Sequence, residues 1–310
     1  MFGNKGDTLP SRREQAAVLA LVKKTRGDWH GTADVIESAR SALRVVHGSW
    51  TGFEPDDVRE SALVQSVDDR DLDEFEALIE RHQQRGIHLL TVLDADYPRN
   101  LRLVYNRPPF LWVRGALSPS DERSIAVVGT RSASPEGLDQ ARSLAEQLAT
   151  RDVTVLSGLA LGIDGAAHEG ALHAGGRTVS VLGTGINTVY PAAHTELAER
   201  IVEAGGALVS QFWPDAPPTR WSFPLRNAVM SGMAVGTVVV EASKTSGAKM
   251  QARLALEHGK RLFLIDTLVM REEWARRYAR HPATTVVESV DDVIDVLAAL
   301  AQPVEQLVLD

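Results

Sequence analysis

The segment of residues 157–191 constrains the fold of this chain more strongly than any other stretch. It begins with the turn SG at 157–158, which ends an apolar run at 153–156, and it holds the turn GTG at 183–185, which ends a second apolar run at 178–182. Small residues fill the interval at about 162–174 and predict a helix. The order is therefore strand, turn, helix, strand, turn. Free backbone amides at such turns favour an anion, and so does the dipole of a helix that begins there.

Nine short apolar runs predict the strands of one sheet. They are nearly continuous in apolar residues, which is typical of strands with both sheet faces covered. One helix fits into most of the central gaps, so the predicted fold class is α/β, a doubly wound and mostly parallel sheet. Ligands of such sheets bind at the carboxyl ends of the strands. The predicted strands span 87–93, 110–113, 125–128, 153–156, 178–182, 207–210, 237–240, 262–265 and 284–287.

Residues 1–84 predict a small helical N-terminal domain. Apolar residues recur at helical spacing within 16–22, 33–46 and 72–84, and Gly86 follows as a stop. Such a domain can be a partner-binding or DNA-binding module. Alternatively it is a cap that only buries one edge of the main domain, and no basic face stands out.

The α/β domain is predicted to span 85–301, with a capped closing helix at about 293–301, and residues 302–310 form a tail. The chain contains no cysteine, which excludes disulfides, cysteine metal sites and thiol nucleophiles. No apolar run approaches the roughly 20 residues of a membrane span, and the N-terminus lacks the apolar segment of a secretory signal. We therefore expect a cytoplasmic protein without membrane contact.

The net charge of −8 argues against a protein that coats nucleic acid through bulk charge. It is compatible with a local basic groove on an acidic body. Any nucleic-acid binding must then come from backbone amides that the fold holds in position and from a few arginine or lysine side chains.

The first candidate cluster follows the predicted strand at 125–128. Gly129 lets a phosphate approach the backbone, and Thr130 and Ser134 offer hydroxyl groups. Arg131 offers a guanidinium fork for a phosphate. The alternative is an arginine that caps the sheet edge or pairs with a carboxylate. The position at a strand end favours the binding interpretation.

A second cluster lies on the same edge of the predicted sheet. Ser157, Gly158 and Gly162 form its turn. Asp164 opens the following helix, where we expect it to cap the helix or to contact a ligand. His168 is expected to pack in the core and not to act as a catalyst. No Ser–His–Asp or paired-carboxylate arrangement can be assembled from these residues.

Gly183, Thr184 and Gly185 form an incomplete dinucleotide motif, because Thr188 stands in place of the third glycine. No acidic residue for a ribose follows about 20 residues later at a strand end. The Walker pattern of nucleoside triphosphatases is absent as well. We therefore expect no cofactor, no hydride transfer and no nucleotide hydrolysis.

Phe223, Arg226 and Asn227 form a third cluster. Arg226 can contact a phosphate, and Asn227 can hydrogen-bond a base edge or fix a loop. An aromatic ring beside a groove can stack on a base. Trp213 and Trp221 flank the same loop, and packing of that loop explains them equally well.

Several motifs occur in an order that resembles the DprA/Smf family, whose name stands for DNA-processing protein A. The resemblance covers about residues 85–270, and no single motif would carry it. One departure within it is Glu136, which occupies the place of a family tyrosine. The matching segments are DYP at 96–98, PP at 108–109, RG at 114–115, GTRSASPEG at 129–137, SGLALGIDGAAH at 157–168, VLGTG at 181–185, YP at 190–191, FPLRN at 223–227, SG at 231–232 and EASKTSG at 241–247.

This resemblance implies an extended Rossmann-like domain that binds single-stranded DNA and is not an enzyme. It implies a role in DNA processing, natural transformation or recombination, in which the DNA is protected and passed to a RecA-type recombinase. It places Gly137, Ser246 and Gly247 among the site positions, beside the phosphate pocket that begins at Gly129. It further implies a homodimer that uses the surface near residues 235–264.

The chain departs from the family where relatives carry arginine, at Leu161, Leu225 and Ala228. Arg220, Lys244 and Lys249 are candidates to replace the lost charge. Each lost phosphate contact weakens DNA binding and flattens its salt dependence.

These departures leave two other functions open. One is a sensor of a small nucleotide ligand on the same scaffold. The other is a phosphoribohydrolase, because a related enzyme family shares the scaffold. That family's motif P-G-G-x-G-T-x-x-E is absent here, so this function ranks last.

Overall fold

The computed structural model describes residues 11–25, 29–49 and 67–301 of the chain. The predicted tail at 302–310 lies outside the described residues, as do parts of the predicted N-terminal domain. No helix among the described residues is long and apolar enough to cross a membrane.

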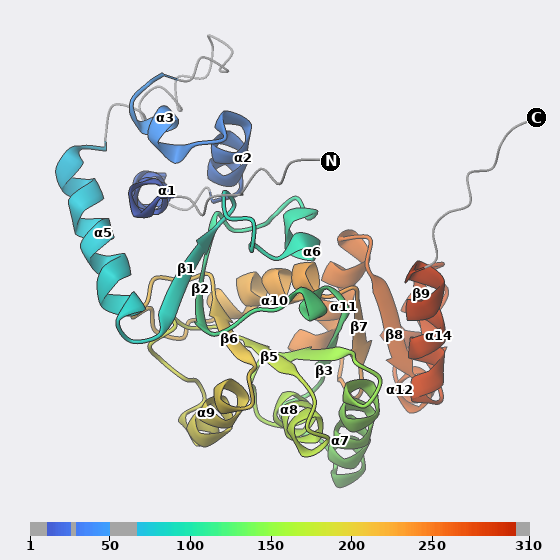
Figure 1. Ribbon diagram of the computed structural model, residues 1–310. Coiled ribbons are helices and arrows are strands. Elements are labelled where there is room, and N and C mark those ends of the chain that lie inside the picture. Colours follow the sequence, from blue (N-terminus) through green and yellow to red (C-terminus); the bar gives the residue numbers. More distant parts are fainter. Residues whose placement is uncertain (1–10, 26–28, 50–66, 302–310) are drawn as a thin grey trace, which may run out of the picture.

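One sheet of nine strands forms the centre of the molecule, in the order β1-β2-β6-β5-β4-β3-β7-β8-β9 (Figure 1). All nine predicted strands are confirmed, each within a few residues of its expected bounds. The pairs β1–β2 and β2–β6 are antiparallel, and the other pairs are parallel. The strands are β1 (Ile87–Thr91), β2 (Phe110–Gly115), β3 (Ser124–Val128), β4 (Thr154–Ser157), β5 (Thr178–Val181), β6 (Ala207–Ser210), β7 (Gly236–Val239), β8 (Arg261–Ile265) and β9 (Thr284–Val287).

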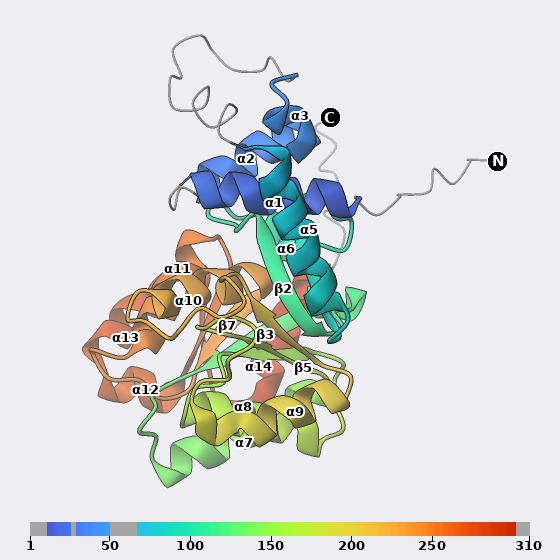
Figure 2. The ribbon, with the colours of Figure 1, turned by 90° about the vertical axis from the view of Figure 1, so that its left-hand side faces the viewer.

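Helices cover both faces of this sheet. α7, α8 and α14 pack on one face, and α10 and α11 pack on the other (Figures 1 and 2). The helices that follow β2 in the chain are α7 (Pro135–Ala149), α8 (Ile163–His173), α9 (Thr195–Glu203), α10 (Ser222–Met233), α11 (Gly247–Glu257), α12 (Asp266–Arg271), α13 (Glu273–Tyr278) and α14 (Val290–Ala301), with the short 3-10 turns η1 (Pro119–Glu122) and η2 (Ala192–His194).

Two hydrophobic cores explain why the strands are apolar on both sides. Ile125 and Val127 of β3 belong to the core under α7 and α8. Ala126 and Val128, which alternate with them, belong to the core under α10 and α11. Every residue of β3 is therefore buried, as expected for a central strand of a doubly wound sheet. The predicted fold class is confirmed.

The N-terminal helices pack against the edge of the sheet formed by β1 and β2. Their apolar residues share one core with these strands, and the Trp29 and Phe110 rings lie 5.6 Å apart. The helices are α1 (Arg12–Lys24), α2 (Trp29–Ala39), α3 (Ala42–Val46) and α5 (Asp69–Gln83), followed after β1 by the short α6 (Arg99–Arg102). A single helix over 33–46 is wrong, because Arg40 takes a positive φ of 54° and Ser41 caps a new helix.

Ion pairs occupy the basic residues of α1. Arg13 contacts Asp69, Asp73 and Glu76 of α5, and Lys24 contacts Asp71. These cations face a neighbouring helix, so they do not form a free basic surface. This arrangement fits the cap interpretation of the N-terminal helices better than a DNA-binding one.

Candidate functional site

A cavity of about 360 Å³ opens at the carboxyl ends of the central strands, where ligands of doubly wound sheets bind. Loops after β3, β4 and β7 form its walls, together with one side of α10. It brings together residues from all three predicted clusters. The predicted site residues that line it are Gly129, Thr130, Arg131, Asp164, Phe223, Arg226, Asn227, Ser246 and Gly247.

Arg131 lies at the mouth of this cavity, on the loop after β3. Its guanidinium carbon is 5.0 Å from the centre of the Phe223 ring, a cation–π contact. The side chain is exposed and makes no ion pair with the described residues. Gly129 keeps the loop close to α8, because a Cβ there would lie 2.2 Å from Cγ1 of Ile163. Arg131 is therefore a cation available to an anionic ligand.

Arg226 forms the floor of the cavity and is almost completely buried. Its Nη1 donates to the carbonyl of Val181 at 3.0 Å. Burial lowers the pKa of this guanidinium, and the nearby carboxylate of Asp164 opposes that shift. Nε of Arg226 has no partner among the described residues. The charge of Arg226 is thus balanced by Asp164, and its Nε–H is buried without a partner.

Asp164 is buried beside Arg226. The prediction that it caps α8 is wrong, because the helix begins after Gly162 and has no side-chain cap. Its carboxylate instead accepts from the amide of Gly158 at 3.1 Å. Burial raises the pKa of Asp164, while Arg226 and the amides of Ala160, Gly158 and Gly129 lower it. These turn amides face a carboxylate of the protein itself, so they do not form an open anion cradle.

Other residues of the first two clusters support the loops without lining this cavity. The Ser157 hydroxyl donates to the carbonyl of Val127 at 2.7 Å. Ser134 caps α7 by accepting from the amide of Gly137, and its hydroxyl donates to Glu241. Ser134 and Gly137 line an adjacent cavity of about 520 Å³ instead.

The glycine positions allow close approaches between loops. A Cβ on Gly162 would lie 2.3 Å from the carbonyl of Thr130, and φ at Gly162 is +77°. A Cβ on Gly183 would lie 2.7 Å from the Phe223 ring, and one on Gly185 would overlap two carbonyl groups. Thr184 is buried, and its hydroxyl bonds to the carbonyl of Thr188. The GTG turn therefore leaves room for the Phe223 ring, and Thr184 closes the loop up to Thr188.

The remaining predicted cations do not line the cavity. Arg220 and Lys244 are exposed and Lys249 is partly exposed. Arg220 lies over the ring of Trp221, with 4.9 Å between the guanidinium carbon and the ring centre. His168 is fully buried, and its Nδ1 hydrogen-bonds to the Thr178 hydroxyl at 2.7 Å, as expected for a core histidine.

The sequence interpretation missed part of the wall. Ser243 and Thr245 line the cavity from the loop between β7 and α11, and the lining is completed by Val128, Ala160, Met230, Ala248 and Gln251. This loop also presents the N-terminus of α11, where Ser246 caps the helix. The available signal was the group of hydroxyl residues Ser243, Thr245 and Ser246 in the loop that follows β7.

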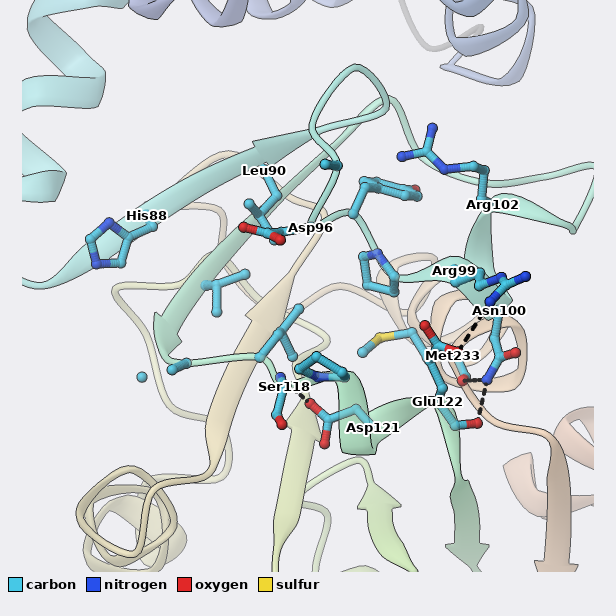
Figure 3. Close-up of a pocket in the computed structure, with 18 residues that line it drawn as sticks. His88, Leu90, Asp96, Arg99, Asn100, Arg102, Ser118, Asp121, Glu122 and Met233 are labelled. Atoms are coloured by element: carbon cyan, nitrogen blue, oxygen red, sulfur yellow. Dashed lines mark hydrogen bonds and ion pairs between the residues drawn. The ribbon is translucent and has the colours of Figure 1, made fainter. Parts of the chain in front are cut away.

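A second cavity, of about 490 Å³, lies on the opposite side, where η1 enters β3 and Met233 precedes β7 (Figure 3). Several of its polar groups bond to each other. The amide of Asn100 donates to the carbonyls of Glu122 and Met233, and the backbone of Ser118 donates to Asp121. This second cavity faces the amino ends of the strands. The cavity beside Arg131 is therefore the better candidate site.

The described residues hold no group of three histidine, aspartate or glutamate side chains that could bind a metal ion. The fold and the cavity together define the class: a Rossmann-like α/β protein with a cavity lined by two arginines at the carboxyl ends of its central strands. The family model described as DNA recombination-mediator protein A matches residues 88–298. The chain belongs to this family.

Individual relatives agree with this family. Protein Smf of Escherichia coli is 44% identical over 183 residues, covering 59% of this chain and 49% of that protein. DNA processing protein DprA of Bacillus subtilis is 32% identical over 185 residues, covering 59% and 62%. The chain thus spans about half to two thirds of the length of these curated relatives.

Solved structures share the fold. DprA from Streptococcus pneumoniae aligns with a TM-score of 0.67 at 26% identity, covering 93% of this chain and 98% of that one. DNA processing protein A from Helicobacter pylori aligns with a TM-score of 0.60 at 22% identity, covering 69% and 96%.

Proposed function

We propose that this protein binds single-stranded DNA at the cavity beside Arg131, as a DNA-processing protein in transformation or recombination. The observation that carries the proposal is the pairing of Arg131 with Phe223 at the mouth of that cavity. A cation for a phosphate and a ring for a base stand side by side, which is the combination that single strands require. The relatives are named for DNA processing, and DprA of Helicobacter pylori binds single-stranded DNA.

The proposed role is binding and not catalysis, carried out in the cytoplasm. The protein would protect the strand and pass it to a RecA-type recombinase. The proposed homodimer contact near residues 235–264 needs an exposed surface, and β7 and β8 are interior strands. The contact therefore uses the outer side of α11, where Arg253 and Glu257 are exposed.

A small nucleotide is the second candidate ligand. The cavity volume of about 360 Å³ is in the range of small-molecule sites. Arg131 lines this cavity and is exposed, so one guanidinium group is available to a single bound phosphate.

Titration separates the two ligands. Labelled dT oligomers of increasing length are titrated with the protein at low salt, beside a panel of mononucleotides and dinucleotides. We expect affinity to rise with oligomer length and a duplex of the same length to bind more weakly. Tight binding of one nucleotide without binding of long dT would replace the proposal by the sensor function.

A further inference from the structure

Two of the family segments, DYP at 96–98 and RG at 114–115, take no part in the candidate site. All three residues of the first segment and Gly115 of the second line the second cavity instead, whose volume is about 490 Å³ (Figure 3). The ring of Tyr97 is fixed there, because its buried hydroxyl donates to the carbonyl of Pro108 at 2.6 Å. These segments therefore help to build a cavity that the proposed function does not use.

The floor of the second cavity is one face of β1 and β2. Ile87 and Leu89 of β1 are buried, whereas His88 is exposed, Leu90 is partly buried and both line the cavity. Val113, the partner of His88 on β2, lies on the same face. Further apolar groups of the lining come from Tyr97, Pro98, Leu117, Pro119 and Met233. An apolar floor with a volume of this size is typical of a site for a small organic molecule.

The arginines of the lining already have partners in the protein. Arg102 pairs with Glu37 at 2.9 Å, and its Nη2 donates to the carbonyl of Asp94 at 2.8 Å. Arg99 is exposed, and its Nη1 lies 3.7 Å from a carboxylate oxygen of Glu122. An anionic ligand would therefore have to compete with a carboxylate at each arginine.

Asp96, in contrast, is free to bind a ligand. Its carboxylate is exposed, and it makes no hydrogen bond or ion pair within the part of the chain that the structure describes. Figure 3 shows it between His88 on one side of the cavity and Arg99 on the other. Burial raises the pKa of the neighbouring Asp94, and the negative charge of Asp96 raises it further. The potential on this side of the cavity is therefore negative, and it attracts a positively charged group.

We propose that the second cavity binds a small organic cation, with its apolar body on β1 and β2 and its ammonium or guanidinium group beside Asp96. Burial of the apolar body against the floor favours binding, and the cationic group donates a charge-assisted hydrogen bond to the carboxylate. This site is separate from the candidate site, because the two cavities share no lining residue. The inference therefore does not depend on the proposed binding of DNA.

The methyl groups of methionine report on the two cavities separately. Met233 lines the second cavity, Met230 lines the candidate site, and Met270 is exposed on α12. The full chain, isotope-labelled at these methyl groups, is titrated by nuclear magnetic resonance with tryptamine, which joins a flat apolar ring to an ammonium group. A parallel titration uses indole-3-propionate, which carries a carboxylate on the same ring.

We expect tryptamine to shift the Met233 signal in a saturable way and to leave the other two signals in place. Indole-3-propionate should bind at least about fivefold more weakly, because it loses an ion pair and meets a like charge. No shift of Met233 overturns the proposal. Equal affinities for the two probes overturn it as well, and so do equal shifts of all three methionines, which would indicate adsorption without a site.

Asp96→Asn tests the place of the cationic group. The variant keeps the size of the side chain and removes its charge, so tryptamine should bind about 1.5- to fivefold more weakly, the range of an exposed ion pair. Glu273→Gln is the matched control, because it removes an exposed carboxylate of α13 that does not line the cavity. Unchanged affinity for tryptamine in Asp96→Asn, or an equal loss in Glu273→Gln, overturns the proposal.

Discussion

Gly158 lies directly against the guanidinium of Arg226: a Cβ atom on this glycine would be 1.3 Å from Nη1. The same glycine donates its amide to Asp164, the carboxylate that faces Arg226. The turn after β4 therefore packs closely against the start of α10, and this packing leaves no room for a Cβ atom at position 158. The position of the buried cation depends on that fit.

Gly158→Ala should displace Arg226 from the floor of the cavity. Arg226 is buried and bonded to the carbonyl of Val181, so its shift should lower the free energy of unfolding by about 1–3 kcal/mol, as overpacking does. Urea unfolding followed by circular dichroism measures the change. Gly247→Ala is the control for stability, because nothing lies within 4 Å of the added Cβ. Equal stability of Gly158→Ala and wild type would contradict the proposed fit.

Arg131→Ala should weaken binding of dT oligomers by about 1–3 kcal/mol, the range for a hydrogen bond to a charged group. The fold should not change, since the side chain is exposed. Arg142→Ala is the matched control, because this surface arginine pairs with Asp139 and Glu169 on the α7–α8 side. Fluorescence anisotropy measures both variants. An unchanged affinity in a folded Arg131→Ala protein would remove Arg131 from the site.

The salt dependence of DNA binding should be shallow. Arg226 faces Asp164, so the cations near the site that remain for phosphates are Arg131, Arg220, Lys244 and Lys249. Each contact to a single strand contributes about −0.7 to the slope of log K against log salt, so the slope should be no steeper than about −3. Titrations between low and moderate sodium chloride give the slope. A steeper one would require basic residues elsewhere, such as those outside the described ranges.

The strands and the position of the cavity could be predicted because they follow from local patterns. A run such as 125–128 is apolar throughout only if both of its faces are covered, and the structure buries it between two cores. Carboxyl ends of parallel strands meet at one edge, so residues as distant in sequence as Arg131 and Arg226 could be assigned to one site.

The hydrogen-bond partners, backbone conformations and ring contacts of individual residues could not be predicted in the same way. Asp164 accepts from the turn that precedes its helix, which depends on how the chain folds back between Gly158 and Gly162. The break at Arg40 depends on a positive φ that the surrounding apolar pattern does not indicate. Tyr190 joins the site only because the loop after β5 brings its ring onto Phe223.

Acidification should destabilise the protein through His168. Burial lowers the pKa of this histidine to about 3, against 6.5 for the ordinary side chain. Below pH 6.5 the unfolded chain binds a proton that the folded protein does not, so stability is fully present above that pH. It falls as the pH drops toward 3, by at most about 1.4 kcal/mol per pH unit for one such group. His258, whose pKa burial lowers to about 4, adds to the same trend.

His168→Gln tests this origin of the pH dependence. Glutamine does not titrate, so the variant should be less stable at pH 7 but lose less of its remaining free energy of unfolding between pH 7 and 5. Urea unfolding at pH 7, 6 and 5 measures the stability at pH 7 and its change with pH. This pH interval lies above the range in which most carboxylates titrate. His88→Gln, which replaces an exposed histidine of β1, should keep the wild-type slope. A wild-type slope in His168→Gln would mean that this buried imidazole does not control acid stability, and that the loss arises from other groups.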